Sequence, residues 1–416
     1  EELSFQEAAS KAAEQRPFVV HMPSVANRLG MGPFPAFDLL SLYAFVRPAR
    51  FCLPTPAGVA ETMGLRRPKD LYEQVTILPE AARLLLAELS NSEADADLAD
   101  LVGIMTEAGW PWSPAVSRAL EATGAPATRA TGRGFEIWRR LPVWREDAPE
   151  GEPSSNPVPA DEARQRLASM LGENAETRPQ QSDYASACSA AFQPREDATA
   201  PDVVLAEAGT GVGKTLGYLA PASLWAERNG APVWIATYTR NLQRQIDDEL
   251  DKLFPISAEK QAHVVIRKGR ENYLCLLNFE ESARSVRRYP EDAVGLALMA
   301  RWASTSRDGD LVGGDMPGWL SDLASPRITI GLADRRGECI YAACTHYQKC
   351  FIERSVRRAR RARLVVANHA LVMAQAALGG LDDSHTPTRY IFDEGHHVFD
   401  AADSAFSAAL TGLEAR

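Results

Sequence analysis

From residue 163 onward, short apolar runs alternate with stretches of helical periodicity. The runs are Val203–Leu205, Val233–Ala236, Val264–Ile266, Leu364–Val366 and Tyr390–Phe392, and each precedes a turn or a helix-like pattern. Alternation of this kind predicts a parallel sheet with helices on both faces. The expected fold class is therefore α/β.

The amino-terminal part is less regular and ends in a linker. Residues 147–161 hold four prolines and several acidic residues, a composition typical of a linker. A length of 416 residues suits about three units of roughly 150 residues each. We expect a small α/β domain at 1–105, a connecting region and linker at 106–161, and a main domain at 162–416. An arginine-rich helical insertion at about 272–350 interrupts the main domain.

A glycine-rich segment carries the strongest chemical signal. It reads Ala-Glu-Ala-Gly-Thr-Gly-Val-Gly-Lys-Thr and lies between an apolar run and a helical pattern. Backbone N–H groups of such a turn can surround a polyphosphate. Lys214 would meet the outer phosphates, and the Thr215 hydroxyl would ligate Mg²⁺. The alternative is a chance glycine-rich turn before a surface lysine. The expected nucleotide-binding residues are Ala208, Gly209, Thr210, Gly211, Val212, Gly213, Lys214 and Thr215.

A pair of carboxylates makes this interpretation more specific. Asp393 and Glu394 directly follow the apolar run at 390–392. At a strand end beside a phosphate-binding loop, Asp393 would hold Mg²⁺ and Glu394 would deprotonate the attacking water. An isolated Asp-Glu pair is common on solvated loops. Together with the loop, the pair indicates a nucleoside triphosphatase.

Charge and hydropathy limit the other classes. The formal net charge is −10, so nucleic-acid binding requires a local basic track. A run with six arginines in ten residues is a candidate for this track. The alternative is that these arginines form a solvated helix face. Leu364–Leu381 is apolar, but it contains Asn368, His369 and Gln375, which favours buried core over a membrane span. No secretory signal opens the chain, and we expect a cytoplasmic protein without a membrane partner. The candidate track is Arg354, Arg357, Arg358, Arg360, Arg361 and Arg363.

Four of the six cysteines form a suggestive group. Cys339, Cys344 and Cys350 are separated by four and five residues, and 63 residues lie between Cys275 and Cys339. Clustered cysteines in a cytoplasmic chain suggest a metal, and no Cys-x-x-Cys pair typical of zinc is present. Four thiolates in this arrangement suit a 4Fe–4S cluster that pins the insertion together. The alternative is that these cysteines are simply buried.

Several further motifs occur in order over about 220 residues. They are Arg178-Pro179-Gln180-Gln181, the loop at 208–215, Thr237–Gln243, Lys268–Cys275, Val366–Leu371 and Asp393-Glu394-Gly395-His396. On these motifs, residues 175–416 resemble the DinG/XPD family of iron–sulfur superfamily 2 helicases. The spacing of the cysteines resembles the DinG branch, and the family's phosphate-binding loop usually begins with alanine.

The resemblance implies roles for individual residues. Gln181 would recognise adenine, and the hydroxyls of Thr237–Thr239 would touch the backbone of single-stranded DNA. His396 would couple the nucleotide to domain motion. Cys275, Cys339, Cys344 and Cys350 would hold the 4Fe–4S cluster. The implied activity is ATP-dependent unwinding, 5′ to 3′, of single-stranded or forked DNA in repair or replication.

Two features qualify the resemblance. Val19-Val20-His21 and the segments after it are similar to part of a DnaQ-like exonuclease, but Ala26 stands where that family has an aspartate. Such nucleases need carboxylates to hold two metals, so we expect an RNase H-like remnant without activity. The chain also lacks an initiator methionine and stops 20 residues after His396. We therefore expect the front part of a helicase, truncated before its second RecA-like domain and only weakly active alone.

Three hypotheses remain open at this point: a DNA helicase motor, an iron–sulfur DNA-binding module that uses ATP only as a switch, and an active exonuclease. A second RecA-like half encoded downstream would favour the motor over the switch. Metal-dependent release of nucleotides by residues 1–105 would favour the nuclease.

Overall fold

The computed structural model describes residues 3–144, 153–172, 176, 178–195, 201–335, 338–377 and 389–407. The chain divides into two compact units, each made of two stretches of sequence. The first unit joins Glu1–Arg145 to Arg270–Glu353, and the second joins Glu146–Gly269 to Arg354–Arg416. The stretch Arg270–Glu353 of unit 1 contains the predicted insertion at about 272–350. The predicted domain limits stay predictions.

Unit 1 is mainly helical. Its α-helices are α1 (Phe5–Glu14), α2 (Met22–Leu29), α3 (Leu39–Val46), α4 (Pro56–Thr62), α5 (Leu71–Ser90), α6 (Ala96–Glu107), α7 (Ser113–Ala122), α13 (Leu276–Ser285), α14 (Ala293–Thr305), α15 (Gly318–Ala324) and α16 (Pro326–Leu332). Its short 3₁₀ helices are η1 (Arg133–Phe135), η2 (Ile137–Arg139), η4 (Arg270–Asn272), η5 (Pro290–Asp292), η6 (Tyr341–Ala343) and η7 (Tyr347–Lys349).

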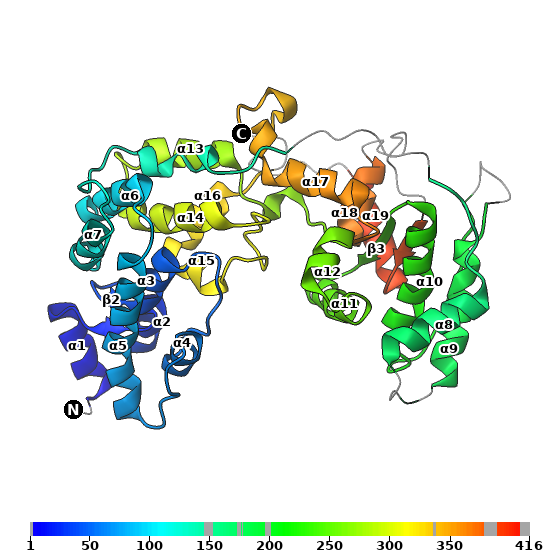
Figure 1. Cartoon of the computed structure of the whole chain (residues 1–416), viewed down its shortest axis with the longest axis horizontal. Helices are drawn as coiled ribbons and strands as arrows, with labels where there is room; N and C mark the ends of the chain where they lie inside the picture. The colour runs from blue at the N-terminus through cyan, green and yellow to red at the C-terminus, as the bar shows by residue number, and fades with distance from the viewer. Residues whose placement is uncertain are drawn as a thin grey trace. The chain divides into compact units, whose positions relative to one another are not determined.

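The core of unit 1 is built from both stretches of its sequence. Helix α14 contacts α3 and α6, and all three are apolar on most of their surface (Figure 1). The buried Arg301 of α14 donates from Nε to the carbonyl oxygen of Phe45 at 2.8 Å. Trp319 of α15 likewise donates to the carbonyl oxygen of Cys52 at 2.9 Å. Residues about 250 positions apart therefore share one hydrophobic core.

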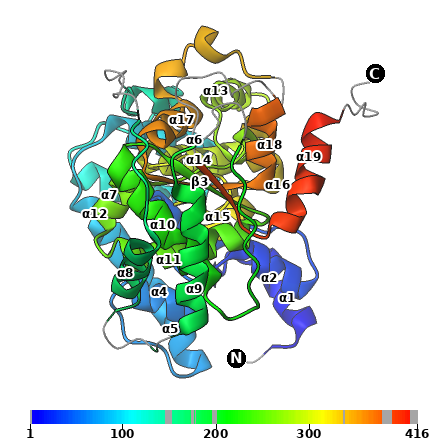
Figure 2. The ribbon, with the colours of Figure 1, turned by 90° about the vertical axis from the view of Figure 1, so that its right-hand side faces the viewer.

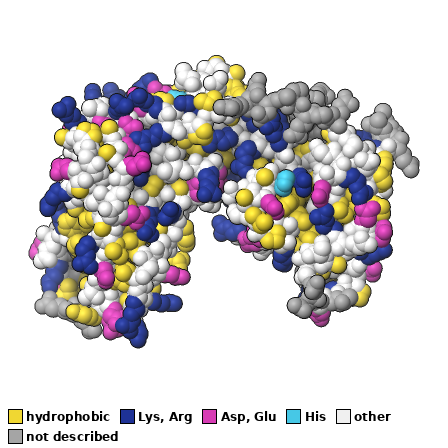
Figure 3. All heavy atoms as spheres, in the orientation of Figure 1, with side chains coloured by type: hydrophobic (Ala, Val, Ile, Leu, Met, Phe, Trp, Pro, Cys, Tyr) yellow, Lys and Arg dark blue, Asp and Glu magenta, His cyan; other side chains and the backbone are white. Residues whose placement is uncertain are grey.

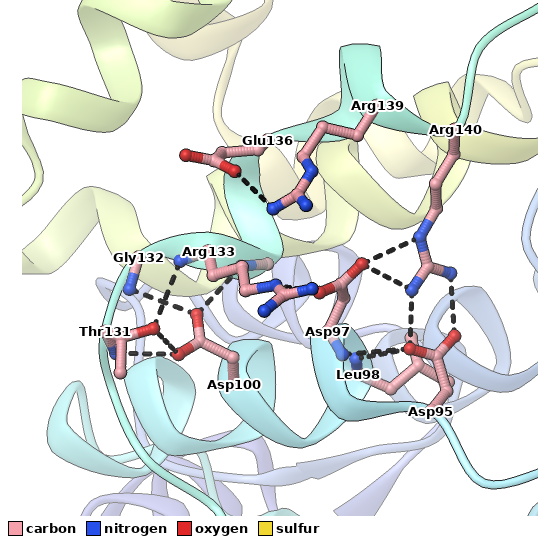
Figure 4. Close-up of polar contacts among 11 residues, drawn as sticks. Asp95, Asp97, Leu98, Asp100, Thr131, Gly132, Arg133, Glu136, Arg139 and Arg140 are labelled. Atoms are coloured by element: carbon pink, nitrogen blue, oxygen red, sulfur yellow. Dashed lines mark hydrogen bonds and ion pairs between the residues drawn. The ribbon is translucent and has the colours of Figure 1, made fainter.

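A polar network fixes the segment that follows α7 (Figure 4). The buried carboxylate of Asp100 accepts hydrogen bonds from the backbone N–H groups of Thr131, Gly132 and Gly134. Arg140 makes ion pairs with Asp95 at 2.5 Å and Asp97 at 2.7 Å. Buried backbone N–H groups need such partners, so this network holds η1 and η2 against α6.

The predicted α/β character of residues 1–105 is little developed in the structure. Strands β1 (Phe18–Val19) and β2 (Phe37–Asp38) form a parallel pair of two residues each. Within the described part of residues 3–105, all other regular structure is helical. An exonuclease-like remnant here is not confirmed and stays a prediction.

Unit 2 contains the larger sheet. Its strands are β3 (Val233–Thr237), β4 (Val264–Ile266), β5 (Leu364–Asn368) and β6 (Arg389–Phe392). Its α-helices are α8 (Ala160–Leu171), α9 (Pro179–Cys188), α10 (Lys214–Asn229), α11 (Arg240–Leu253), α12 (Ser257–His263), α17 (Phe351–Arg361, in which the unit boundary falls), α18 (His369–Ala377) and α19 (Val398–Phe406), with 3₁₀ helices η3 (Ser189–Phe192) and η9 (Gly395–His397).

The four strands are parallel and run in the order β4-β5-β3-β6. All residues of the central strand β3 are buried, as expected for a parallel strand covered on both faces. Helices α8, α9 and α10 pack together beside the sheet (Figure 2). This arrangement confirms the predicted parallel α/β sheet and is compatible with a RecA-like domain.

One predicted strand is wrong. Val203–Leu205 is irregular, and its three side chains are 72%, 37% and 93% exposed. Three apolar residues provide little area to bury, and the segment does not pair with β6, the last strand in the order of the described sheet. The glycine-rich loop therefore follows an irregular segment and leads directly into α10.

The apolar stretch from Leu364 is a strand followed by a helix, as predicted, and residues 378–381 of it lie outside the described part of the chain. Among the helices that the structure describes, none combines the length and apolarity needed to cross a membrane.

Candidate nucleotide site and cysteine cavity

The glycine-rich loop ends where α10 begins. Gly211 and Gly213 have φ angles of 83° and 85°, in the left-handed region that favours glycine. Gly213 is the N-cap residue of α10, so Lys214 and the partly buried Thr215 open the first turn of the helix. Ala208, Gly209, Thr210 and Val212 lie in the same irregular turn. The positive end of the α10 dipole therefore lies at the loop, where it favours phosphate.

Helix α9 supports the loop from one side. Gln181 is 3% exposed, and its Nε2 donates to the carbonyl oxygen of Gly213 at 2.9 Å. A β-carbon on Gly213 would lie only 2.2 Å from that nitrogen. Arg178, not predicted as a site residue, donates from Nη1 to the carbonyl oxygen of Gly211 at 3.3 Å. Recognition of adenine by Gln181 stays a prediction.

The two carboxylates reach the loop from the end of β6. The backbone N–H of Asp393 donates to Ala236 of β3 at 2.8 Å, so the sheet holds this residue in place. Glu394 Oε1 lies 3.4 Å from the Nζ of Lys214. Thr237 Oγ1 lies at the same distance from Asp393 Oδ2. Residues 180 positions apart in the sequence therefore meet at one site.

The environment of Asp393 disfavours its negative charge. Burial raises the pKa of this carboxyl, and the neighbouring Glu394 raises it further, while Lys214 acts in the opposite direction. A divalent cation beside Asp393 would offset both unfavourable contributions. Glu394 has φ 53° and ψ 49°, a left-handed conformation that is uncommon for a residue other than glycine. Such backbone conformations cluster at functional sites.

Three histidines surround the carboxylates. His396 Nδ1 lies 3.6 Å from Glu394 Oε2, and its ring is adjacent to that of His397 at 4.1 Å. The rings of His397 and Tyr238 are stacked, with centroids 3.8 Å apart. His369 is buried, and its Nε2 lies 3.1 Å from the carbonyl oxygen of Ala236. Burial lowers the pKa of His369, which favours the neutral ring.

All four predicted cluster ligands line one cavity in unit 1. Cys275, Cys339, Cys344 and Cys350 share this lining with Arg270 and His346, among others. Burial raises the pKa of Cys350 to about 11 and raises that of Cys275. In the part of the chain that the structure describes, no three His, Cys, Asp or Glu side chains are preassembled to hold a metal ion. The donor set suits iron, but the cluster stays a prediction.

A basic side chain reaches into this cavity. Arg270 donates from Nη2 to the sulfur of Cys339 at 2.7 Å and from Nε to the buried Asp334 at 2.7 Å. Its guanidinium also lies over the ring of Tyr341 at 4.9 Å. Hydrogen-bond donors beside the ligand atoms are typical of metal sites, so the contact is consistent with Cys339 as a metal ligand.

The predicted arginine track forms much of α17 and the residues after it. Arg358 donates to the carbonyl oxygen of Gln261 at 3.0 Å, and Arg363 lies 3.9 Å from Glu227. Some of the track is therefore engaged within the protein. Basic and acidic side chains are interspersed on the visible face (Figure 3).

Comparisons with known proteins place this site in context. No protein-family model matches the chain. The chain is 30% identical over 260 residues to the ATP-dependent helicase DinG of Mycobacterium tuberculosis, which is 57% of this chain and 37% of that protein. It is 31% identical over 222 residues to the ATP-dependent DNA helicase YoaA of Escherichia coli, covering 51% and 32% of the two chains.

A third relative, the 3'-5' exonuclease DinG of Bacillus subtilis, is 32% identical over 232 residues, covering 54% of this chain and 23% of that protein. The matched regions span about a third or less of the length of these relatives. Over about half of its length the chain is therefore similar to DinG-like helicases, as the motifs in its sequence predict.

Proposed function

We propose that this chain is part of an ATP-dependent DNA helicase and contains its ATP-binding, RecA-like domain. The observation that carries the proposal is the approach of Glu394 to Lys214 at 3.4 Å, beside Asp393. ATP hydrolysis requires a cation that binds phosphate, a carboxylate that binds the metal and a base for the attacking water.

Each site residue has one task in this proposal. The loop N–H groups and Lys214 bind the phosphates, and Thr215 and Asp393 bind Mg²⁺. Mg²⁺ neutralises phosphate charge. Glu394 accepts the proton of the attacking water. Gln181 binds adenine, and His396, beside Glu394, connects the nucleotide to domain motion.

The proposed substrate is single-stranded or forked DNA, along which the motor moves 5′ to 3′. Tyr238 and Thr239 follow β3 beside the nucleotide site, are exposed and would contact the strand, whereas Thr237 is buried against Asp393. Arginines of the candidate track at 354–363 would exchange contacts within the protein for contacts to phosphates, which makes binding salt-dependent. An ATP switch without unwinding remains the alternative, and it predicts coupled binding of ATP and DNA without strand separation.

Nucleotide binding tests the site directly. Lys214→Ala removes a charged hydrogen-bond donor to phosphate, an interaction of about 1.5–3 kcal/mol, so affinity for Mg²⁺–ATP should fall roughly 10- to 100-fold. Fluorescence titration with a labelled ATP measures this change. Lys252→Ala, which removes an exposed lysine paired with Glu249 on α11, is the matched control. Equal affinities of the two variants would contradict the assignment of the site.

We also propose that the four cysteines hold a 4Fe–4S cluster. Their shared cavity and the hydrogen bond from Arg270 to Cys339 support this assignment. The four cysteines would bind iron as thiolates, as metal ligation requires. The cluster would bind the segment at 339–350 to the start of α13 at Cys275.

Removing one ligand tests the cluster. Cys344→Ser should abolish the brown visible absorbance of anaerobically purified protein and most of its bound iron, because the cluster needs all four thiolates. Cys188→Ser, which changes a buried cysteine of α9, should leave the spectrum unchanged. A wild-type protein without iron, or an unchanged spectrum in Cys344→Ser, would contradict the proposal.

For residues 1–105 we propose a catalytically inactive remnant. Ala26 is buried in α2, at the position where a nuclease of the similar family would need a carboxylate. Nothing in the described part of this region favours nuclease activity as a second function.

A further inference from the structure

An aromatic pair connects two segments of the proposed site that have different tasks. Tyr238 follows β3 directly, and His397 ends η9 beyond the catalytic carboxylates. Their rings are parallel within 13°, with centroids 3.8 Å apart. Tyr238 is 47% exposed, so the pair lies at the surface and adds little to the hydrophobic core. A stack in this place calls for an explanation other than core packing.

The pair continues into the nucleotide site through adjacent side chains. His397 is next to His396, whose Nδ1 lies 3.6 Å from Glu394 Oε2. The other oxygen of Glu394 lies 3.4 Å from the Nζ of Lys214. The path from the Tyr238 ring to the phosphate-binding lysine therefore contains only contacting side chains. Energetic coupling between sites is carried by such contiguous contacts.

The other end of the path is open to a ligand. Tyr238, Thr239 and Arg240 are exposed in sequence at the start of α11, where Thr239 caps the helix. An aromatic ring, a hydroxyl and a guanidinium together suit a single strand, through stacking on bases and contacts to phosphates. A strand bound here would press on the same ring that contacts His397.

The backbone from Glu394 to His397 is a short segment whose conformation can respond to a ligand at Tyr238. Its left-handed conformation is followed by the single 3₁₀ turn of η9, which ends at His397. The conformation of a short turn with an unfavourable residue depends on contacts at its ends. The stack with Tyr238 is such a contact. A shift of His397 would change where Glu394 lies relative to Lys214.

We propose that the Tyr238–His397 stack couples binding of single-stranded DNA to the nucleotide site, with His397 as a positioning residue. This inference rests on the proposed function. DNA at Tyr238 and Mg²⁺–nucleotide at Lys214 favour the same arrangement of η9, so each ligand strengthens binding of the other. His397 touches neither ligand.

The test measures this coupling by binding alone. The affinity of the full chain for a fluorescent, non-hydrolysable ATP analogue with Mg²⁺ is measured with and without saturating oligodeoxythymidine. The ratio of the two dissociation constants is the coupling factor, typically about 5 to 150 between coupled sites. The reverse titration, of DNA with and without analogue, must give the same factor because linkage is reciprocal.

Variants at His397 decide the role of the stack. His397→Ala should reduce the coupling factor to about 1, while the affinity for each ligand alone changes less than about twofold. His397→Phe keeps an aromatic ring and should keep the factor. His263→Ala is the matched control, because it also removes a histidine ring from an aromatic pair. His263 ends α12, and its ring centroid lies 5.7 Å from that of Phe254. The factor of this control should equal that of the wild type.

The outcomes separate this inference from the function on which it rests. A wild-type chain that binds neither ligand overturns the proposed function. A wild-type chain that binds both without coupling, or His397→Ala with the wild-type factor, overturns the role of the stack alone. If thermal unfolding shows that His397→Ala does not fold, His397→Gln removes the ring with a polar side chain of similar length. The same loss of coupling is expected of His397→Gln, and a retained factor would overturn the inference.

Discussion

Replacing Glu394 by glutamine should slow ATP hydrolysis by about 10²–10⁴-fold while nucleotide binding is kept, because an amide cannot accept the proton of the attacking water. Binding should even tighten. The substitution removes a negative charge near the triphosphate and releases Lys214 from its partner at 3.4 Å. It also removes a contribution that raises the pKa of Asp393, which favours the ionised, metal-binding form.

The two effects are measured separately, hydrolysis as single-turnover phosphate release and binding as titration with labelled ATP. Glu249→Gln, which changes an exposed glutamate paired with Lys252, is the matched control and should behave as wild type. The assignment of Glu394 as the base would fail if Glu394→Gln hydrolysed ATP at the wild-type rate. A fall in affinity with an unchanged rate would instead indicate a role in binding.

The larger sheet was predictable because its strands are buried on both faces. Such strands appear in the sequence as continuous apolar runs, and the structure places strands at 233–237, 264–266, 364–368 and 389–392. Val203–Leu205 has the same local appearance and is exposed. Whether an apolar run joins a sheet depends on a partner edge, and no local pattern contains that information.

The candidate site also contains some residues that a sequence pattern reveals and others that only the structure reveals. The loop glycines, Lys214 and the two carboxylates are predictable as a candidate site because the proposed chemistry needs particular residue types at fixed spacings. Arg178 and His397 were not identified as site residues. Arg178 acts through a carbonyl oxygen and His397 through a ring contact, so neither interaction has a sequence signature.

The core of unit 1 depends on contacts that sequence patterns cannot reveal. The sequence predicts an insertion held together by a metal cluster, because an isolated segment of that size has too little core. In the structure α14 packs against α3 and α6, which lie about 200 to 250 residues earlier. The segment therefore has a hydrophobic core in common with the amino-terminal helices. Its folding need not depend on the cysteines alone.

Trp302→Ala should test this common core with an effect on stability of about 3–5 kcal/mol, because it leaves a large cavity at a fully buried position. The substitution also removes the indole N–H that donates a hydrogen bond to Asp315 at 2.9 Å. If the two stretches of unit 1 form one cooperative body, amide hydrogen exchange should accelerate together in α3, α6 and α14.

Trp225→Ala makes a comparable cavity in unit 2 and is the matched control, with faster exchange expected in β3 and β5. Exchange that accelerates in α14 but not in α3 or α6 would contradict a common core. The segment at 270–353 would then be an autonomous insertion whose order depends on its metal. The amino-terminal helices would have no part in holding the cysteine cavity.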